Sequence, residues 1–150
     1  MHTETYNEHP KYIIEDIAYL VNELEAYMPI GYDELSIDFV TEATICELHE
    51  RFLQNPEPTD VITFPATEED EEKVGEICIS VDEALKYTHI QSLEKELTLY
   101  LVHGWLHLAG FDDIEEADRS IMRQKEREVL QYLSQQSCPH VVVKTLGQLQ

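Results

Sequence analysis

Apolar residues recur every three or four positions in several stretches of the chain, and this spacing is typical of one face of an α-helix. The first stretch predicts a helix over residues 12–28, and its inward side chains are Ile13, Ile17, Leu20 and Leu24. Thr41 can cap a second helix, whose predicted inward side chains are Ile45, Leu48 and Phe52. A last helix is predicted over residues 115–133, with inward side chains Ile121, Met122, Val129, Leu130 and Leu133.

Shorter segments with alternating polarity predict β-strands. In ELSIDFV (residues 34–40), the predicted inward side chains are Leu35, Ile37 and Phe39. DVITFP (residues 60–65) and VGEICIS (residues 74–80) predict two more strands. In the latter, Ile77 and Ile79 are expected on one face, and the side chains expected on the other are Glu76, Cys78 and Ser80. The acidic run between these strands, ATEEDEEK (residues 66–73), predicts an exposed loop because like charges repel and stay solvated.

Two further helices complete the pattern. Ser80 to Glu83 has the sequence of a capping box and predicts a short helix, and residues 92–109 predict a longer, buried one. The tail, from about residue 138 to 150, either adds an edge strand or packs loosely. We therefore expect one domain over residues 1–150 of the α+β (mixed) class, a small mixed β-sheet packed with about five helices.

The net charge of the chain restricts its partners. The sequence has 31 acidic and 10 basic residues, a formal net charge of −21. Such a surface repels phosphate backbones, so electrostatic, sequence-independent binding to long nucleic acids is disfavoured. Any contact with nucleic acid is expected at a local patch.

The sequence also indicates where the protein works. Its first ten residues, MHTETYNEHP, lack the basic and apolar regions of a secretory signal, and no apolar run is long enough to span a bilayer. The three cysteines are scattered and form no C-x-x-C pair. A cytoplasmic protein without a membrane partner is therefore expected.

The buried helix carries the candidate chemistry at its end, in LVHGWLHLAGFDD (residues 101–113). His103 and His107 are one helical turn apart, so both rings point the same way, and a metal ion would satisfy both buried imidazoles. Gly110 can adopt a left-handed conformation that ends the helix, after which Asp113 can reach the same ion. Two nitrogens and one carboxylate oxygen would leave the fourth position of a tetrahedral zinc ion open for water.

Several alternatives to this site remain open. Histidines on an apolar helix face also occur as ordinary core residues, and Asp113 could cap the last helix while Asp112 binds the metal. The same ligands can hold non-haem iron. The segment also resembles the H-E-x-x-H-x-x-G-x-x-H/D string of metzincin proteases, but Gly104 stands where they have a general-base glutamate. A metalloprotease is therefore disfavoured.

The segment HGWLHLAGFDD (residues 103–113) closely resembles the H-G-x-L-H-L-x-G-[YF]-D-H motif of the bacterial YbeY endoribonucleases. PTDVITFP (residues 58–65) is similar to the family's P-T-D-V-L-S-F-P, and GEICIS (residues 75–80) to its G-D-I-x-I-S. Met122 and Glu126 match an M…E spacing in the last helix. The matching segments run from about residue 48 to about residue 130.

The resemblance implies a cytoplasmic, metal-dependent endoribonuclease that prefers single-stranded RNA. It would act in 3′-end maturation of 16S ribosomal RNA and in ribosome quality control, with ribosomal particles or ribosomal proteins as partners. The family's ligands carry over to His103 and His107, and its third histidine to Asp113, around one zinc ion or another divalent transition metal. The added negative charge of Asp113 is expected to make the ion a weaker Lewis acid. A ribosome-associated binding factor with a structural zinc ion is the alternative from another class.

Four other residues are candidates for the site. Thr59 and Asp60 could line the cleft through a hydroxyl and a carboxylate, although Asp60 could equally be a turn or strand-edge residue. Arg119 and Arg123 are one helical turn apart and could clamp a phosphate while the metal polarises the scissile one. Pairing of these arginines with neighbouring glutamates is the alternative.

One position departs from the YbeY pattern outside the metal motif. The family usually has an arginine six residues before the threonine of P-T-D-V, and Leu53 stands there. Arg51 is close in sequence but points to another side of its helix, so it is a poor replacement. Since the arginine would be expected to hold a phosphate, nuclease efficiency depends on what replaces it.

Overall fold

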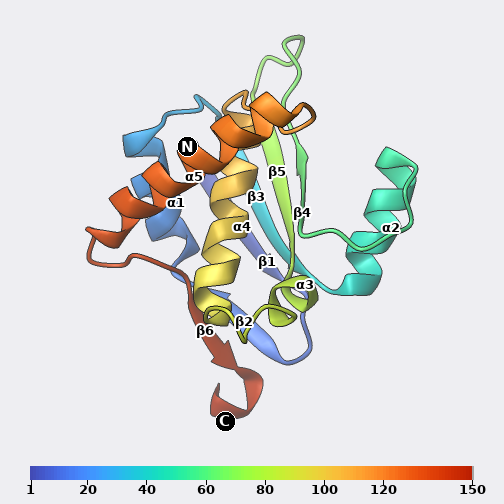
Figure 1. Cartoon of the computed structure of the whole chain (residues 1–150), viewed down its shortest axis with the longest axis vertical. Helices are drawn as coiled ribbons and strands as arrows, with labels where there is room; N and C mark the ends of the chain where they lie inside the picture. Colours follow the sequence, from blue (N-terminus) through green and yellow to red (C-terminus); the bar gives the residue numbers. More distant parts are fainter. Residues whose placement is uncertain (150) are drawn as a thin grey trace.

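The computed structural model describes residues 1–149, which form a mixed four-stranded sheet, a two-stranded sheet and five α-helices (Figure 1). The larger sheet has the order β1-β3-β5-β4, and its strands are β1 (His2–Asn7), β3 (Glu34–Val40), β5 (Val74–Ser80) and β4 (Val61–Phe64). β1 and β5 run parallel to β3, whereas β4 runs antiparallel to β5. The predicted α+β (mixed) class is confirmed.

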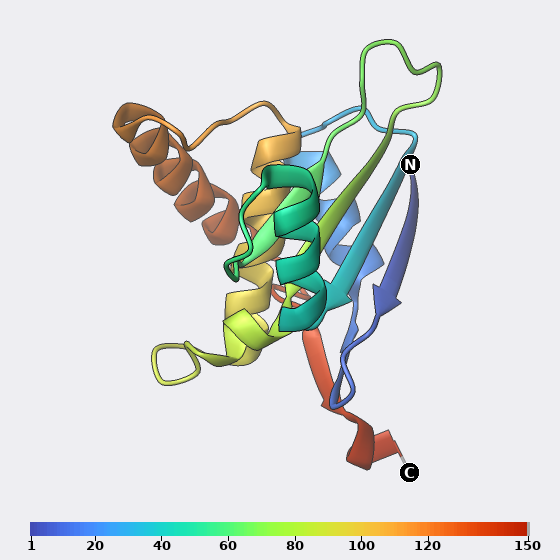
Figure 2. The same ribbon diagram turned by 90° about the vertical axis from the view of Figure 1, so that its right-hand side faces the viewer.

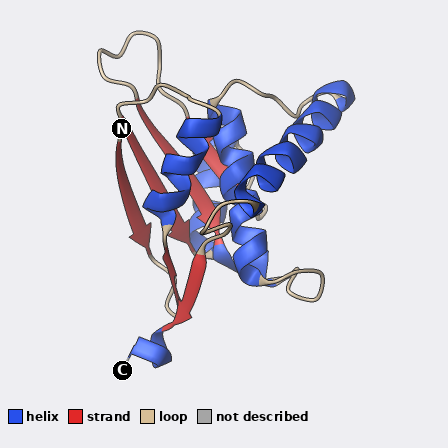
Figure 3. Cartoon of the chain, turned by 90° about the vertical axis from the view of Figure 1, so that its left-hand side faces the viewer, coloured by secondary structure: helices blue, strands red, loops and turns tan. Residues whose placement is uncertain are grey.

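Helices cover both faces of the larger sheet (Figures 1 and 2). On one face lie α1 (Ile17–Tyr27) and α4 (Leu93–Leu108), and on the other lies α2 (Glu42–Leu53). The short α3 (Val81–Leu85) directly follows β5. α5 (Glu116–Ser134) packs on α1 and α4, away from the sheet, and Figure 3 shows it standing outermost on the helical side.

The two covered faces explain why side chains on both faces of β5 are buried. Leu35, Ile37 and Phe39 are fully buried against α1 and α4, as their alternation predicts. Cys78 and Ser80, predicted on the face opposite Ile77 and Ile79, are also buried, at 3% and 0% exposed. Because α2 covers this second face of the sheet, alternation in β5 does not separate buried from exposed positions.

The predicted start of the first helix is wrong. Residues Tyr12–Glu15 form β2, which pairs antiparallel with β6 (Val142–Thr145) from the far end of the chain. Asp16 adopts a left-handed conformation with φ 65°, and α1 begins after it, at Ile17. The apolar spacing fits a helix across this segment, but a distant strand supplies its backbone partners. β1 is a further strand that the polar sequence HTETYN did not indicate.

Two side chains predicted to face inward are exposed. Phe52, in the last turn of α2, is 49% exposed and packs edge-on against Phe64 of β4, with ring centroids 5.0 Å apart. Ile121 of α5 is 48% exposed, whereas its neighbour Met122 is buried. α5 contacts the core along one narrow side, so residues beside that line remain in solvent.

The tail is held by α4 as well as by β2. Val141 is fully buried, and its N–H donates a hydrogen bond to the Thr98 hydroxyl at 3.0 Å. The Val143 N–H donates to the Glu94 carboxylate at 3.1 Å. Of the two alternatives for the tail, residues 142–145 adopt the strand. No helix among residues 1–149 is long and apolar enough to cross a membrane.

Candidate metal centre

The helix that carries the two histidines is fixed at both ends. At its start, the Ser92 hydroxyl caps α4 by accepting a hydrogen bond from the Lys95 N–H, which confirms the predicted beginning. Farther along, the buried Trp105 donates its indole N–H to the Met28 carbonyl at 3.0 Å. This bond ties the helix to the segment after α1, so the histidine-bearing face has a defined orientation.

Gly110 ends the helix as predicted. It has φ 102°, a conformation that disfavours residues with a Cβ. The Gly110 N–H donates to the His107 carbonyl and the Phe111 N–H to the Leu106 carbonyl, both at 3.0 Å. These two bonds define a Schellman motif, and Phe111 then packs on the core. The turn brings the following residues back toward the histidine face.

The turn brings Asp113 to the two histidines of α4, so the three predicted ligands lie together. The Nε2 atoms of His103 and His107 are 3.1 Å apart, and Oδ2 of Asp113 lies 3.3 and 3.5 Å from them. A tetrahedral ion with bonds of about 2.0–2.2 Å keeps its ligand atoms about 3.3–3.6 Å apart. Two imidazole nitrogens and one carboxylate oxygen at these separations fit a single divalent cation such as zinc.

The two aspartates after the turn have different positions. Asp112 is exposed, and its carboxylate accepts a hydrogen bond from the Asp113 N–H at 2.7 Å. The residue at the cap position of α5 is Glu115, so Asp113 does not cap this helix. Asp113 is therefore the aspartate beside the histidines.

Glu126 supports the site from α5. Its Oε1 lies 3.2 Å from Nδ1 of His103, and the two side chains are 14% and 18% exposed. Burial alone would lower the pKa of His103, but the hydrogen bond to Glu126 and the negative charges of Glu126, Asp60 and Asp113 raise it above its ordinary value. A carboxylate bonded to a ligand histidine orients the ring and increases its basicity. Sequence reasoning did not assign this role, and its only signal was the M…E match.

Gly104 faces the sheet and allows α4 to approach it closely. A Cβ at this position would lie 2.7 Å from Cγ2 of Ile77 and 3.3 Å from Cγ2 of Val61. The first distance is shorter than Cβ contacts in real proteins, so a larger side chain would push the helix away. A glutamate, as in the metzincin string, does not fit here.

A cleft of about 530 Å³ opens beside the three ligands, along the edge strand β4. Its lining residues are Phe52, Leu53, Thr59, Asp60, Val61, Ile62, Thr63, Phe64, His103, His107 and Asp113. β4 thus forms the floor, α4 and the Asp113 loop form one wall, and the end of α2 forms the other. The described lining contains no lysine or arginine.

The comparisons with known proteins agree with this architecture. The family model described as Endoribonuclease YbeY matches residues 2–134. The chain belongs to the endoribonuclease YbeY family. The Endoribonuclease YbeY of Protochlamydia amoebophila is 38% identical over 121 residues, which are 77% of this chain and 81% of that relative. That of Caldicellulosiruptor bescii is 34% identical over 140 residues, 83% and 87% of the two chains.

A solved structure extends the likeness to the fold. The solution structure of TM1509 from Thermotoga maritima superposes with a TM-score of 0.56 at 29% identity and covers 87% of each chain. The resemblance to the YbeY family noted in the sequence motifs is confirmed.

Thr59 and Asp60 lie at the start of the cleft floor. Oδ1 of Asp60 accepts hydrogen bonds from the Val61 N–H at 2.7 Å and from the Thr59 hydroxyl at 3.4 Å. The Asp60 carbonyl also accepts from the Ser80 N–H at 2.9 Å. Asp60 thus serves as a strand-edge residue and also adds negative charge near His103.

Arg119 and Arg123 are exposed on α5 and do not belong to the cleft lining described above. Arg119 donates a hydrogen bond to the Ile114 carbonyl at 2.7 Å. Within residues 1–149, neither arginine forms an ion pair with a neighbouring glutamate, whereas Lys125 pairs with Glu128 at 3.1 Å. The structure does not bring the two arginines to the ligands.

Leu53, which replaces the arginine expected from the YbeY motifs, lines the cleft and is 56% exposed. Arg51 does not line the cleft, but its guanidinium carbon lies 5.5 Å from the centroid of the Phe52 ring, which does. The wall opposite the histidines is therefore apolar where a YbeY protein is expected to be cationic.

Proposed function

We propose that this chain, an endoribonuclease by its family, cleaves single-stranded RNA with one zinc ion held by His103, His107 and Asp113. The triangle of two imidazole nitrogens and one carboxylate oxygen, open to the cleft, carries this proposal. When bound, such an ion supplies Lewis-acid activation of water and of a phosphate group. A structural zinc site is normally closed by four protein ligands, so three ligands at a cleft favour catalysis.

The protein residues have separate tasks in this proposal. Glu126 keeps a proton on Nδ1 of His103, so that the Nε2 lone pair is free to point at the ion. The Thr59 hydroxyl, bonded only weakly to Asp60 at 3.4 Å, can turn to donate to a phosphate oxygen. A phosphate clamp by Arg119 and Arg123 stays a prediction, and it requires a strand that extends from the cleft to α5.

The proposed substrate is ribosomal RNA, at the 3′ end of 16S RNA and in ribosome quality control, which would place the reaction in the cytoplasm. The net charge of −21 supports a short, local contact with an unpaired segment rather than a long duplex footprint. The same acidic surface is complementary to basic ribosomal proteins, which are the proposed partners.

Cleavage of a single-stranded RNA by the pure protein tests this function. His107→Ala should lower the cleavage rate by about 100-fold or more, which corresponds to about 2.7 kcal/mol of activation free energy. His89→Ala, which removes an exposed histidine outside the cleft, is the matched control and should leave the rate unchanged. Elemental analysis of protein purified without added metal identifies the ion. Full activity of His107→Ala would refute the mechanism.

A peptidase is the second candidate, because β4 is an edge strand whose free side lines the cleft and could bind an extended peptide. The packing of Gly104 weighs against it, since the usual general-base glutamate has no room there. Peptide hydrolysis that EDTA abolishes, together with no cleavage of RNA, would reverse the ranking of the two functions.

A further inference from the structure

The wall opposite the histidines carries an aromatic pair that is not buried. Phe52 is 49% exposed, and its ring meets the Phe64 ring at an interplanar angle of 77°. Leu53 beside it is 56% exposed. All three side chains line the same cleft as His103 and His107. Large apolar side chains exposed together next to a polar site indicate a contact surface for a ligand.

The turn that carries Phe52 is well fixed although its side chain is exposed. Gln54 ends α2 in a left-handed conformation with φ 54°, and its N–H donates to the Glu50 carbonyl at 3.0 Å. The segment after the helix is tied back to α2, because Nδ1 of His49 bonds to the Glu57 carbonyl at 2.7 Å. These bonds fix the backbone that carries the ring, so little backbone freedom is lost when a ligand packs on it.

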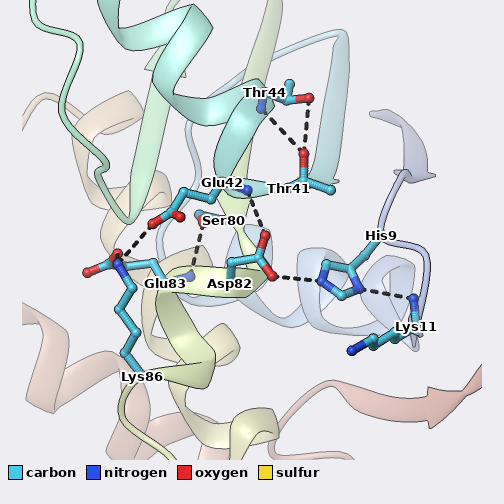
Figure 4. A network of polar contacts seen from close by, with 9 residues as sticks. All are labelled: His9, Lys11, Thr41, Glu42, Thr44, Ser80, Asp82, Glu83 and Lys86. Atoms are coloured by element: carbon cyan, nitrogen blue, oxygen red, sulfur yellow. Dashed lines mark hydrogen bonds and ion pairs between the residues drawn. The ribbon is translucent and has the colours of Figure 1, made fainter.

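The other end of α2 is fixed by a polar network (Figure 4). The Asp82 carboxylate accepts hydrogen bonds from the Glu42 N–H at 2.7 Å and from Nε2 of His9 at 2.9 Å. Lys86 pairs with Glu42 at 3.0 Å and with Glu83 at 2.8 Å. This network joins α2 to α3 and to the segment after β1, so the helix holds Phe52 at a set position across the cleft.

The charge of the cleft indicates whether the phosphates or the bases of an RNA strand contact the wall formed by Phe52 and Leu53. The described lining has two carboxylates, Asp60 and Asp113, and no lysine or arginine. A phosphate in the cleft therefore meets two carboxylates and no lysine or arginine of the lining, and Arg51 lies beside it, against the Phe52 ring. A nucleobase is flat and uncharged, and it stacks favourably on an exposed aromatic ring.

We propose that Phe52, supported by Phe64, is a stacking platform for an unpaired nucleobase beside the cleavage site. This inference rests on the proposed RNA-cleaving function and specifies how the substrate is held. It also gives a cause for single-strand preference, because a base within a duplex is already stacked and cannot reach the ring. Recognition by stacking replaces the phosphate contact that Leu53 cannot make.

Binding of a short 2′-O-methyl oligonucleotide that carries 2-aminopurine tests the platform. This strand lacks the 2′-hydroxyl, and EDTA removes the metal, so binding is separated from cleavage. The wild-type protein should change the 2-aminopurine fluorescence on binding. Phe52→Ala should weaken binding about 5- to 150-fold, equivalent to about 1–3 kcal/mol per stacked base. Phe52→Tyr should bind like wild type, because it retains the ring.

Three controls make the result specific. Phe52→Leu keeps an apolar side chain without a ring, and it should also lose the fluorescence change. Tyr6→Ala removes a 56% exposed aromatic residue on β1, at the opposite edge of the sheet, and should have no effect. An abasic strand of equal charge should bind weakly to every variant.

The outcomes separate this inference from the proposed function. Unchanged binding by Phe52→Ala, or tight binding of the abasic strand, overturns the platform. Normal stacking by His107→Ala supports it, because the platform lies on the wall opposite the ligands. A wild-type protein that shows stacking but never cleaves RNA would refute the nuclease and leave the platform standing.

Discussion

The two walls of the cleft differ in how their side chains are held. In the wall formed by α4 and its following loop, His103 is 18% exposed and His107 is 24% exposed, and their ring nitrogens lie close to Asp113 and Glu126. In the wall formed by the end of α2, Phe52 and Leu53 are about half exposed and apolar. Rigid, mutually bonded groups suit chemistry, whereas exposed rings suit binding. Substitutions in the histidine wall should therefore reduce stability and metal binding more than substitutions in the α2 wall reduce RNA binding.

The largest effect is expected where the histidine wall rests on the sheet. Gly104→Ala should lower the free energy of unfolding by about 1–3 kcal/mol, because its Cβ would overlap Ile77. Gly104→Glu should prevent folding rather than create a peptidase. Urea denaturation measures both, and Gly147→Ala is the control, since a Cβ there meets no atom within 4 Å. A Gly104→Ala protein as stable as wild type would contradict the close packing.

The second-largest effect is expected at Glu126, whose carboxylate bonds to the ligand His103. Glu126→Gln should weaken metal binding about 10- to 100-fold, because His103 loses the charged partner of its Nδ1. Competition with a chelating dye measures the affinity. Glu128→Gln, on the same helix and paired with Lys125, should bind metal like wild type. Equal affinities for the two variants would show that Glu126 does not support the site.

A carboxyl pair lies on the same face of the sheet as the apolar wall, and it should make stability depend on pH. The hydrogen bond between Glu76 and Asp38, followed by burial and the charge of Asp38, raises the pKa of Glu76 from 4.5 to about 7. Between these values the folded protein retains a proton that the unfolded chain has released, so the free energy of unfolding falls as the pH rises. In Glu76→Gln, the decrease in the free energy of unfolding between low and high pH should be about 1 kcal/mol smaller than in wild type, after allowance for solvent screening.

Urea denaturation at about pH 5 and about pH 8 tests this difference, since the two values bracket the titration. Glu47→Gln, at an exposed position of α2, is the charge-matched control. The same pH dependence in wild type and Glu76→Gln would exclude the pair as its source.

The smallest effect is expected from restoring a cation to the apolar wall. Leu53→Arg should tighten binding of single-stranded RNA about two- to fivefold at low salt, as expected for one exposed ion pair. The slope of log affinity against log salt should steepen by about 0.7, the value for one phosphate contact on a single strand. Leu53→Gln is the uncharged control. A tighter complex with an unchanged salt slope would show that the arginine acts through packing instead.

The elements around the histidines were predictable because their determinants are local. Ser92, the spacing of His103 and His107, and the left-handed Gly110 define the start, the ligand face and the end of one helix. Thr41 and Ser80 likewise begin their helices as predicted, by accepting hydrogen bonds from N–H groups three residues ahead. Each of these features depends on residues within one or two turns of chain.

The errors concern partners that are distant in sequence. Residues 12–15 have helical spacing but pair with β6. The burial of Cys78 likewise depends on a distant segment, because α2 covers the second face of its sheet. Phe52 has the spacing of a core residue but lies at a helix end beyond the main core. Neither hydrophobic spacing nor composition records which segment will cover a given face.

The sequence by itself therefore determined the fold class, the family and the identity of the three candidate ligands, since periodicity, caps and motif spacing are properties of short segments. Only the tertiary structure decided that Glu126 contacts His103, that Gly104 touches Ile77, and that an apolar wall faces the ligands. The first two contacts join α5 and β5 to α4, whereas α2 faces α4 across the cleft. They depend on how the helices pack across both faces of one sheet, which is a property of the whole folded chain.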